Sequence, residues 1–204
     1  MTTTTQLPTL LVYDTEITDI GDKSILRHPE SLTLGVACTW DRVKGYRDWF
    51  DADTEHLVAY MCSFDYLVGY NNLRFDNPVI LSSFNSVFNG AIIDLFADIH
   101  EATGRMHGLK TVANDNLYIP PASDVDGAAA PKMWASGKRL EVIRYCRKDV
   151  DMTRALLRKL VAEEPLILKN KYQTPKRRNV PIHERTANER KGIDYEIFRQ
   201  LCSE

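Results

Sequence analysis

Residues 9–16 read TLLVYDTE, an apolar run from Leu10 to Tyr13 that ends in two carboxylates. Apolar residues on both faces are typical of a central strand that is covered by helices on each side. Residues two apart on a strand face the same way, so Asp14 and Glu16 should present their carboxylates together. Sheets of α/β proteins usually bind ligands at this end of their strands. Alone, however, a D-x-E pair predicts only surface charge.

The rest of the chain extends this strand into a layered α/β domain. We expect further strands at residues 31–40, 44–50, 65–70 and 91–93, and helices at residues 54–64, from 76, from 95, at 109–117, 140–163 and 194–202. Thr54 and Asp94 stand where helix N-caps are expected. Residues 118–137 contain three prolines and are expected to be irregular. The order predicts a mixed sheet that begins as an antiparallel meander and continues through helical crossovers.

Composition indicates an ordinary globular protein. The 204 residues are 44% hydrophobic and 26% charged, enough for one sizeable domain. No apolar stretch approaches the ~20 residues of a membrane span, and residues 1–8 have no signal-peptide pattern. The four cysteines are scattered without metal-site spacing, which is typical of small buried residues in a reducing compartment. We therefore expect a cytoplasmic location and no contact with a membrane.

Charge divides the chain into two parts. Residues 165–204 hold nine Lys/Arg and five Asp/Glu, whereas the preceding residues are acidic overall. We expect a domain at residues 9–164 followed by a basic C-terminal extension at 165–204. The extension either contacts phosphates or is a loosely ordered, solvated tail, and the sequence leaves both interpretations open.

Two further acidic motifs follow the D-x-E pair. Residues 69–76 read GYNNLRFD and place Asp76 at an expected helix start, where Asp often serves only as a cap. Residues 145–149 read YCRKD and place Asp149 within the longest helix, where Asp is a poor helix former. Tyr145 lies four residues earlier and shares its helix face, whereas Asp151 should point elsewhere and be solvated.

Four carboxylates at one place would repel each other unless cations lay between them. Hard oxygen ligands in this number suit Mg²⁺ or Mn²⁺ rather than zinc. A pair of such ions is typical of enzymes that break phosphodiester bonds. The three motifs together therefore predict a nuclease.

The three motifs, Asp14-x-Glu16, Asn71-x-x-x-Phe75-Asp76 and Tyr145-x-x-x-Asp149, resemble those of the DEDD (DnaQ-like) 3′–5′ exonuclease superfamily, whose fold is ribonuclease-H-like. The resemblance covers roughly residues 10–160. Arg144 occupies the position of the histidine that marks one branch, and Tyr145 that of the tyrosine that marks the other. The chain thus resembles the tyrosine subtype, with closest similarity in motif to exonuclease domains of family B polymerases.

The resemblance implies a role for each motif residue. Asp14, Glu16 and Asp149 would hold one metal ion beside the attacking water, and Asp14 would bridge to a second ion that Asp76 helps to bind through water. Tyr145 would orient the water by hydrogen bonding, because a phenol is mostly neutral at pH 7. The implied substrate is the 3′ end of a nucleic acid, with single-stranded DNA expected over RNA.

Several alternatives stay open. Asn71 fits the family pattern and is expected to contact substrate; Phe75 either does the same, together with Leu73, or packs in the core. Lys110 and Arg74 either contact phosphates or are solvated, and solvated charge is the expectation for both. The five histidines are expected to be surface or core residues. The alternative function is a non-catalytic nucleic-acid- or partner-binding module on the same fold, and a third reading treats the motifs as coincidence. The four carboxylates and Tyr145 together favour the enzyme.

Overall fold

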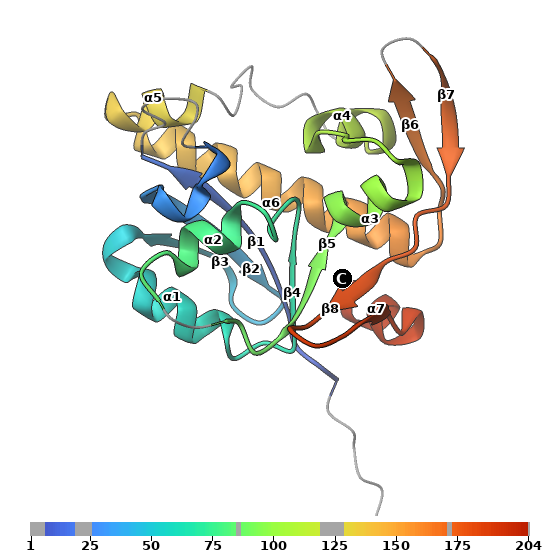
Figure 1. Cartoon of the computed structure of the whole chain (residues 1–204), viewed down its shortest axis with the longest axis horizontal. Helices are drawn as coiled ribbons and strands as arrows, with labels where there is room; N and C mark the ends of the chain where they lie inside the picture. Colours follow the sequence, from blue (N-terminus) through green and yellow to red (C-terminus); the bar gives the residue numbers. More distant parts are fainter. Residues whose placement is uncertain (1–6, 19–25, 85–86, 119–128, 171–172, 204) are drawn as a thin grey trace, which may run out of the picture.

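The strand expected at residues 9–16 lies inside the sheet. The computed structural model describes residues 7–18, 26–84, 87–118, 129–170 and 173–203. In it, β1 (Leu10–Ile17) is the third strand of a seven-stranded sheet ordered β3-β2-β1-β4-β5-β8-β9 (Figure 1). Leu10 and Val12 pack into one hydrophobic cluster, whereas Leu11 and Tyr13 pack into the other. The strand is therefore buried on both faces, as predicted.

The pairing of the strands confirms the mixed sheet. β2 (Leu34–Asp41) is antiparallel to β1, and β3 (Gly45–Phe50) is antiparallel to β2, which forms the expected meander. β4 (Tyr66–Gly69) and β5 (Ala91–Asp94) run parallel to β1 and to each other. Short 3₁₀ turns at Pro29–Ser31 and Asp51–Asp53 precede β2 and follow β3.

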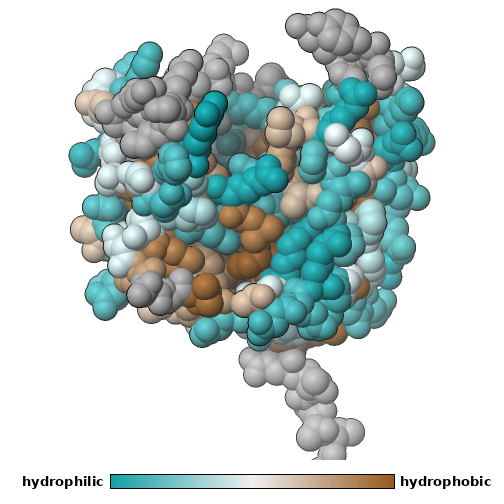
Figure 2. All heavy atoms as spheres, viewed as in Figure 1, coloured by the Kyte–Doolittle hydropathy of each residue, from teal (hydrophilic) through white to brown (hydrophobic). Residues whose placement is uncertain are grey.

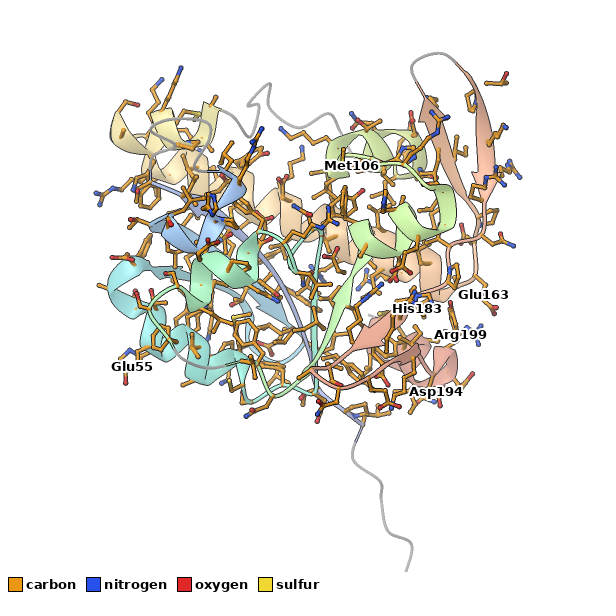
Figure 3. All side chains as sticks on the ribbon, in the orientation of Figure 1. Glu55, Met106, Glu163, His183, Asp194 and Arg199 are labelled. Atoms are coloured by element: carbon orange, nitrogen blue, oxygen red, sulfur yellow. The ribbon has the colours of Figure 1, made fainter. Side chains whose placement is uncertain are left out.

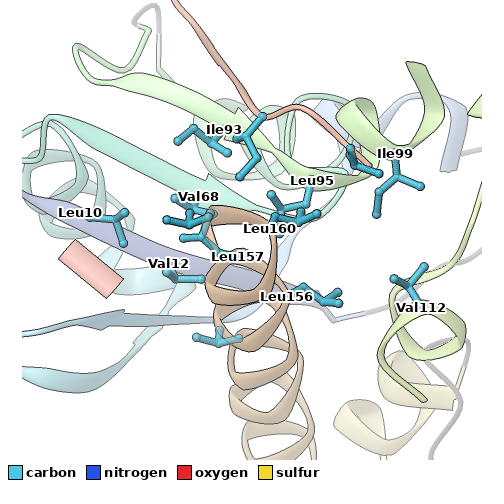
Figure 4. Packing of buried hydrophobic residues seen from close by; sticks show 14 of the residues in the cluster. Leu10, Val12, Val68, Ile93, Leu95, Ile99, Val112, Leu156, Leu157 and Leu160 are labelled. Atoms are coloured by element: carbon cyan, nitrogen blue, oxygen red, sulfur yellow. The ribbon is translucent and has the colours of Figure 1, made fainter. Parts of the chain in front are cut away.

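Helices cover both faces of this sheet. α1 (Thr54–Met61) and α2 (Asp76–Leu81) supply one hydrophobic cluster. The other face is covered by α3 (Leu95–Thr103), α4 (Leu109–Asn116), α5 (Ala130–Ala135) and the 23-residue α6 (Arg139–Val161). Figure 4 shows Leu156, Leu157 and Leu160 of α6 packed against side chains of the sheet.

Two local expectations are wrong. Residues 118–137 are not irregular throughout, because α5 begins at Ala130 with Pro131 in its first turn, where proline is tolerated. Asp53, not Thr54, is the residue that precedes α1, and the Thr54 hydroxyl donates to the Asp51 carbonyl instead. The Asp94 cap is confirmed, since its carboxylate accepts from the Ala97 amide at 3.1 Å.

The described part of the C-terminal segment is ordered into the fold. β6 (Leu166–Asn170) and β7 (Gln173–Arg178) form a separate hairpin, whereas β8 (His183–Arg185) pairs with β5 and β9 (Arg190–Gly192) pairs with β8. α7 (Tyr195–Cys202) closes the chain and packs near α6. Six buried residues of the segment join the α6 cluster: Leu166, Leu168, Val180, Ile182, Ile193 and Phe198. A loosely ordered tail is therefore the wrong interpretation for these residues.

Two remaining expectations concern cysteines and membranes. All four cysteines are free; Cys38 and Cys146 are buried as expected, whereas Cys62 and Cys202 are only partly so. Among the described residues, no helix is both long and apolar enough to cross a membrane.

Candidate metal centre

Three of the four expected carboxylates meet at the carboxyl end of β1. Oxygen atoms of Asp14, Glu16 and Asp149 all lie within 4.8 Å of one another. Asp14 and Glu16 share a face of β1 because they are two residues apart, and α6 carries Asp149 across that face. The crossing is held by the Cys146 thiol, which donates to the Asp14 carbonyl at 3.3 Å.

Their electrostatics are unfavourable without a cation. Burial, followed by the charge of Asp149, raises the pKa of both Asp14 and Glu16 well above the ordinary values. Burial also raises the pKa of Asp149 to about 6. Asp14 Oδ2 and Asp149 Oδ1 are buried and have no hydrogen-bond partner among the described residues. Unpartnered carboxylate oxygens in this arrangement fit a divalent cation such as Mg²⁺ or Mn²⁺.

Asp76 is adjacent to this group but is held differently. Its Oδ1 accepts from the amide and the hydroxyl of Thr15 at 2.9 and 2.7 Å, and it does not cap α2. The residue is buried, which raises its pKa to about 7 although the hydrogen bonds from Thr15 act in the other direction. Its charge contributes to the raised pKa values of Asp14 and Glu16, so the four carboxylates form one electrostatic system.

The turn that carries Asp76 is fixed by Asp94. The two Asp94 carboxylate oxygens accept from the amides of Asn71 and Leu73 at 2.9 and 3.1 Å. Asn71 has φ of 69°, a left-handed conformation that Asn tolerates better than most residues. A Cβ on Gly69 would lie 2.7 Å from the Asn72 side chain, so the close packing of this turn requires glycine.

Asn72 is a structural residue that the motif comparison did not single out. It is fully buried, and its amide nitrogen donates to the Tyr13 hydroxyl at 3.0 Å. Its backbone carbonyl accepts from the Asn77 backbone amide at 2.9 Å, one residue beyond Asp76. Asn71 is half-buried, and no hydrogen bond from its side chain is formed with the rest of the described chain.

Tyr145 lies one helical turn before Asp149, and both are buried on the same face of α6, as predicted. Burial and the neighbouring charges of Asp149 and Glu16 raise the pKa of the Tyr145 phenol, which is therefore neutral at ordinary pH. The hydrogen bond between Tyr145 and Asp149 raises the pKa of the phenol and lowers the pKa of the Asp149 carboxylate. Asp151 points away as expected, but it is paired with Arg154 at 3.2 Å rather than merely solvated.

Lys110 lies beside the candidate metal centre, contrary to its expected place in solvent. Its ammonium lies 4.4 Å from the centroid of the Tyr145 ring, and its charge lowers the pKa of Glu16 and Asp149. The expectation of a solvated charge is therefore wrong. Nothing local in the sequence of α4 identifies this neighbour, because the contact depends on how α4 packs against α6.

The other expected substrate contacts lie around the Asp76 turn. Phe75 is half-buried and packs against the hydrophobic cluster under α2. Part of its side chain therefore packs in the core, which is one of the two alternatives expected for it. Leu73 is exposed and lines an apolar cavity of about 350 Å³ together with Pro78 and Phe88. Figure 2 shows hydrophobic side chains gathered near the centre of the viewed face. Arg74 is exposed, as expected.

A second carboxylate group does not need a metal. Asp98, Glu101 and His183 also bring possible ligand atoms within 4.8 Å of one another (His183 is labelled in Figure 3). The guanidinium of Arg185 lies 2.6 Å from Asp98 and 3.4 Å from Glu101, so a cation of the chain already occupies this position. We interpret the group as an ion-pair network that joins α3 to β8.

Comparisons with known proteins agree with this fold. A family model described as the RNase H superfamily matches residues 11–161, a span that contains all three motifs. Among solved structures, the family B DNA polymerase from the hyperthermophilic archaeon Pyrobaculum calidifontis is similar, with a TM-score of 0.56 and 19% sequence identity. The similarity covers 76% of this chain but only 24% of that polymerase, and at this identity it concerns the fold alone. No curated protein matches the chain.

Proposed function

Because the chain belongs to the RNase H superfamily, we propose that it is a metal-dependent nuclease that removes nucleotides from the 3′ end of a nucleic acid. The observation that carries the proposal is the meeting of Asp14, Glu16 and Asp149, with two buried carboxylate oxygens that have no partner among the described residues. The 3′–5′ direction and the tyrosine subtype rest on the three motifs, and single-stranded DNA is the proposed substrate.

The carboxylates would act as ligands of two ions. Asp14, Glu16 and Asp149 would hold one Mg²⁺ or Mn²⁺, and Asp14 would be shared with a second ion near Asp76. Bound ions of this kind lower the pKa of water and stabilise the leaving oxygen of a phosphodiester. The hydrogen bonds from Thr15 keep Asp76 slightly apart, which suits contact through water.

Tyr145 would orient the attacking water. Its raised pKa excludes it as a strong base near pH 7, whereas a neutral phenol both donates and accepts hydrogen bonds. Lys110 lies over the Tyr145 ring and restricts its position. Asn71 and the uncovered part of Phe75 would contact the terminal nucleotide from the turn beside Asp76.

The test is incubation with 5′-labelled DNA and RNA oligonucleotides, each with Mg²⁺, Mn²⁺ or EDTA, resolved on a sequencing gel. We expect a ladder that shortens from the 3′ end, requires metal and is absent for Asp14→Ala. Cleavage of a circular strand, or full activity in EDTA, would contradict the proposal. Metal-independent binding without cleavage would instead support the alternative of a non-catalytic nucleic-acid-binding module.

A further inference from the structure

A polar cavity lies between the C-terminal hairpin and the turn that joins α3 to α4. Its volume is about 280 Å³, and we call it the hairpin pocket. Arg105 and His107 line it from the turn, and Thr174, Lys176 and Arg178 line it from β7. In Figure 3, Met106 marks this turn, and the hairpin stands beside it in Figure 1.

The alternation of β7 brings its charges into the pocket. Lys176 and Arg178 are two residues apart and therefore lie on one face of the strand, whereas Arg177 lies on the opposite face. Lys176 pairs across the hairpin with Leu168, which is buried in the core cluster. The pocket side of β7 is thus anchored, and its exposed cations are held at the mouth of the cavity.

These cations are not balanced by the chain. The residues that line the hairpin pocket include no carboxylate. Arg105, Lys176 and Arg178 form no ion pair with any residue that the structure describes, whereas Lys169 of the same hairpin pairs with Asp115. Burial, followed by the charge of Arg105, lowers the pKa of His107, which therefore adds no charge near pH 7. Three permanent positive charges around one cavity favour a polyanion.

The hairpin pocket is close to the candidate metal centre along the chain. Only two residues, Gly108 and Leu109, lie between His107 and Lys110, whose ammonium lies over the Tyr145 ring. The Cα atoms of His107 and Lys110 are three steps apart along the chain and therefore lie at most about 11 Å from each other. At about 3.4 Å per stacked nucleotide, this distance corresponds to roughly three nucleotides. The Tyr70 hydroxyl also bonds the His107 carbonyl at 2.5 Å, which ties the turn to the end of β4 next to the Asp76 turn.

We infer that the hairpin pocket binds the phosphodiester backbone of a single nucleic-acid strand, a few nucleotides on the 5′ side of the terminal nucleotide at the metal centre. The inference rests on the proposed function and names a second contact for the same substrate. Arg105, Lys176 and Arg178 would neutralise successive phosphates, and Thr174 would donate a hydrogen bond. The pocket would hold the strand without reading its bases, because all of these groups suit phosphate oxygens.

Binding is tested without catalysis, by fluorescence anisotropy of a labelled dT oligonucleotide of about 12 nucleotides in EDTA. The double variant Lys176→Ala/Arg178→Ala is compared with Arg177→Ala, which removes an exposed charge from the opposite face of the same strand. Each lost phosphate contact lowers the slope of log K against log salt by about 0.7, so the double variant should lose about 1.4. At about 0.1 M salt the same relation predicts affinity weaker by about fivefold per contact. Arg177→Ala should lose much less.

Hydrolysis with Mg²⁺ separates this inference from the proposed function. A dinucleotide is too short to reach the pocket, so the parent and the double variant should cleave it equally, which also shows that the variant is folded. On the longer strand the double variant should show a raised KM and an unchanged kcat. If the parent cleaves both substrates and the double variant binds and cleaves the longer one like Arg177→Ala, the inference is wrong. A different result is that the parent cleaves neither substrate, while the double variant binds the longer strand more weakly than the parent does. In that case the proposed function is wrong, and the hairpin pocket is still supported as a binding site.

Discussion

At the scale of single residues, the candidate metal centre gathers several negative charges in a largely buried place. Asp14, Glu16, Asp76 and Asp149 influence one another from largely buried positions, and Lys110 is the nearby cation whose charge lowers the pKa of two of them. Buried carboxylates without partners oppose folding unless they are protonated or bound to a cation. The metal-free protein should therefore store unfavourable electrostatic energy at this position, so its stability should depend on pH and on added metal.

Stability of the metal-free protein should fall as pH rises. Burial raises the pKa of Asp149 to about 6 and of Asp76 to about 7, whereas an unfolded Asp has a pKa of about 3.9. Between these limits the folded state keeps protons that the unfolded chain has released, so each group lowers stability by about 1.4 kcal/mol per pH unit. The loss of stability from each carboxyl group is complete above the pKa of that group in the folded state. We expect a lower Tm in EDTA at about pH 8 than at about pH 5.

The matched experiments use Asp76→Asn and added metal. Asp76→Asn keeps an oxygen that can accept from Thr15 but removes the titration, so the dependence on pH should become shallower. Mg²⁺ at about pH 8 should raise the Tm of the parent, because ion binding stabilises the folded state. A metal-free parent that is more stable at the higher pH would contradict the unfavourable burial of these carboxylates.

Tyr145→Phe should separate orientation from metal binding. The substitution keeps the ring, its packing and the contact with Lys110, but it removes the hydroxyl beside Asp149. Positioning groups typically contribute about 10²–10⁴-fold, and we expect a loss of single-turnover rate near 10²-fold. Calorimetric affinity for Mn²⁺ should change little, whereas Asp149→Asn should weaken it strongly. Full activity of Tyr145→Phe would identify Tyr145 as a core aromatic residue only.

At the scale of elements, β8 is attached to the sheet mainly through side chains. Its pairing with β5 is limited to one residue pair, Ile92 with Arg185. Arg185 and His183 of β8 both contact Asp98 of α3, a carboxylate that is buried. α7 is held by the buried Phe198 and also by an ion pair, since Arg199 pairs with Glu163 at 2.5 Å after the end of α6 (Figure 3). Ion pairs thus connect the last elements to the helices that precede them.

Arg185→Ala should destabilise the protein more than Arg190→Ala does. Removing Arg185 takes away the guanidinium that pairs with the buried Asp98, and breaking a buried pair typically costs about 3–5 kcal/mol. Arg190 pairs with the half-exposed Glu101, and such surface pairs contribute about 0–1 kcal/mol. Urea denaturation of both variants measures the difference. Equal effects would show that β8 is held by packing and not by this network.

At the scale of the whole molecule, the boundary expected near residue 164 does not separate two cores. The six buried residues of the C-terminal segment lie in the same cluster as α6, and β8 and β9 extend the same sheet. The basic residues of this segment lie on strands and a helix whose apolar side chains complete the core.

A chain that ends at Glu164 should therefore fail to form a stable fold. It lacks six buried apolar side chains, each of which contributes about 1.5–3 kcal/mol when fully buried. Their sum is comparable to the whole stability of a typical domain, about 5–15 kcal/mol. A chain that ends at Cys202 keeps all six residues and should unfold cooperatively in thermal denaturation. A soluble, cooperatively folded protein ending at Glu164 would show that the segment is a dispensable extension.

Local sequence patterns predicted the first five strands of the sheet, most of the helices and the three motifs. Apolar strands, helix periodicity and cap residues act over a few neighbouring positions, so the run at residues 9–16, the Asp94 cap and the shared face of Tyr145 and Asp149 could be predicted. The short strands after Pro165 could not, because β8 and β9 have three residues each and gain their stability from β5, Asp98 and the core.

Which charged groups come into contact depends on tertiary packing. Lys110 reaches Tyr145 only because α4 packs on α6, and Thr15 holds Asp76 only because α2 lies beside the end of β1. The hairpin pocket likewise joins a turn near residue 105 to a strand near residue 176. Such contacts depend on the packing of elements that are far apart in the chain, and local preference carries no information about them.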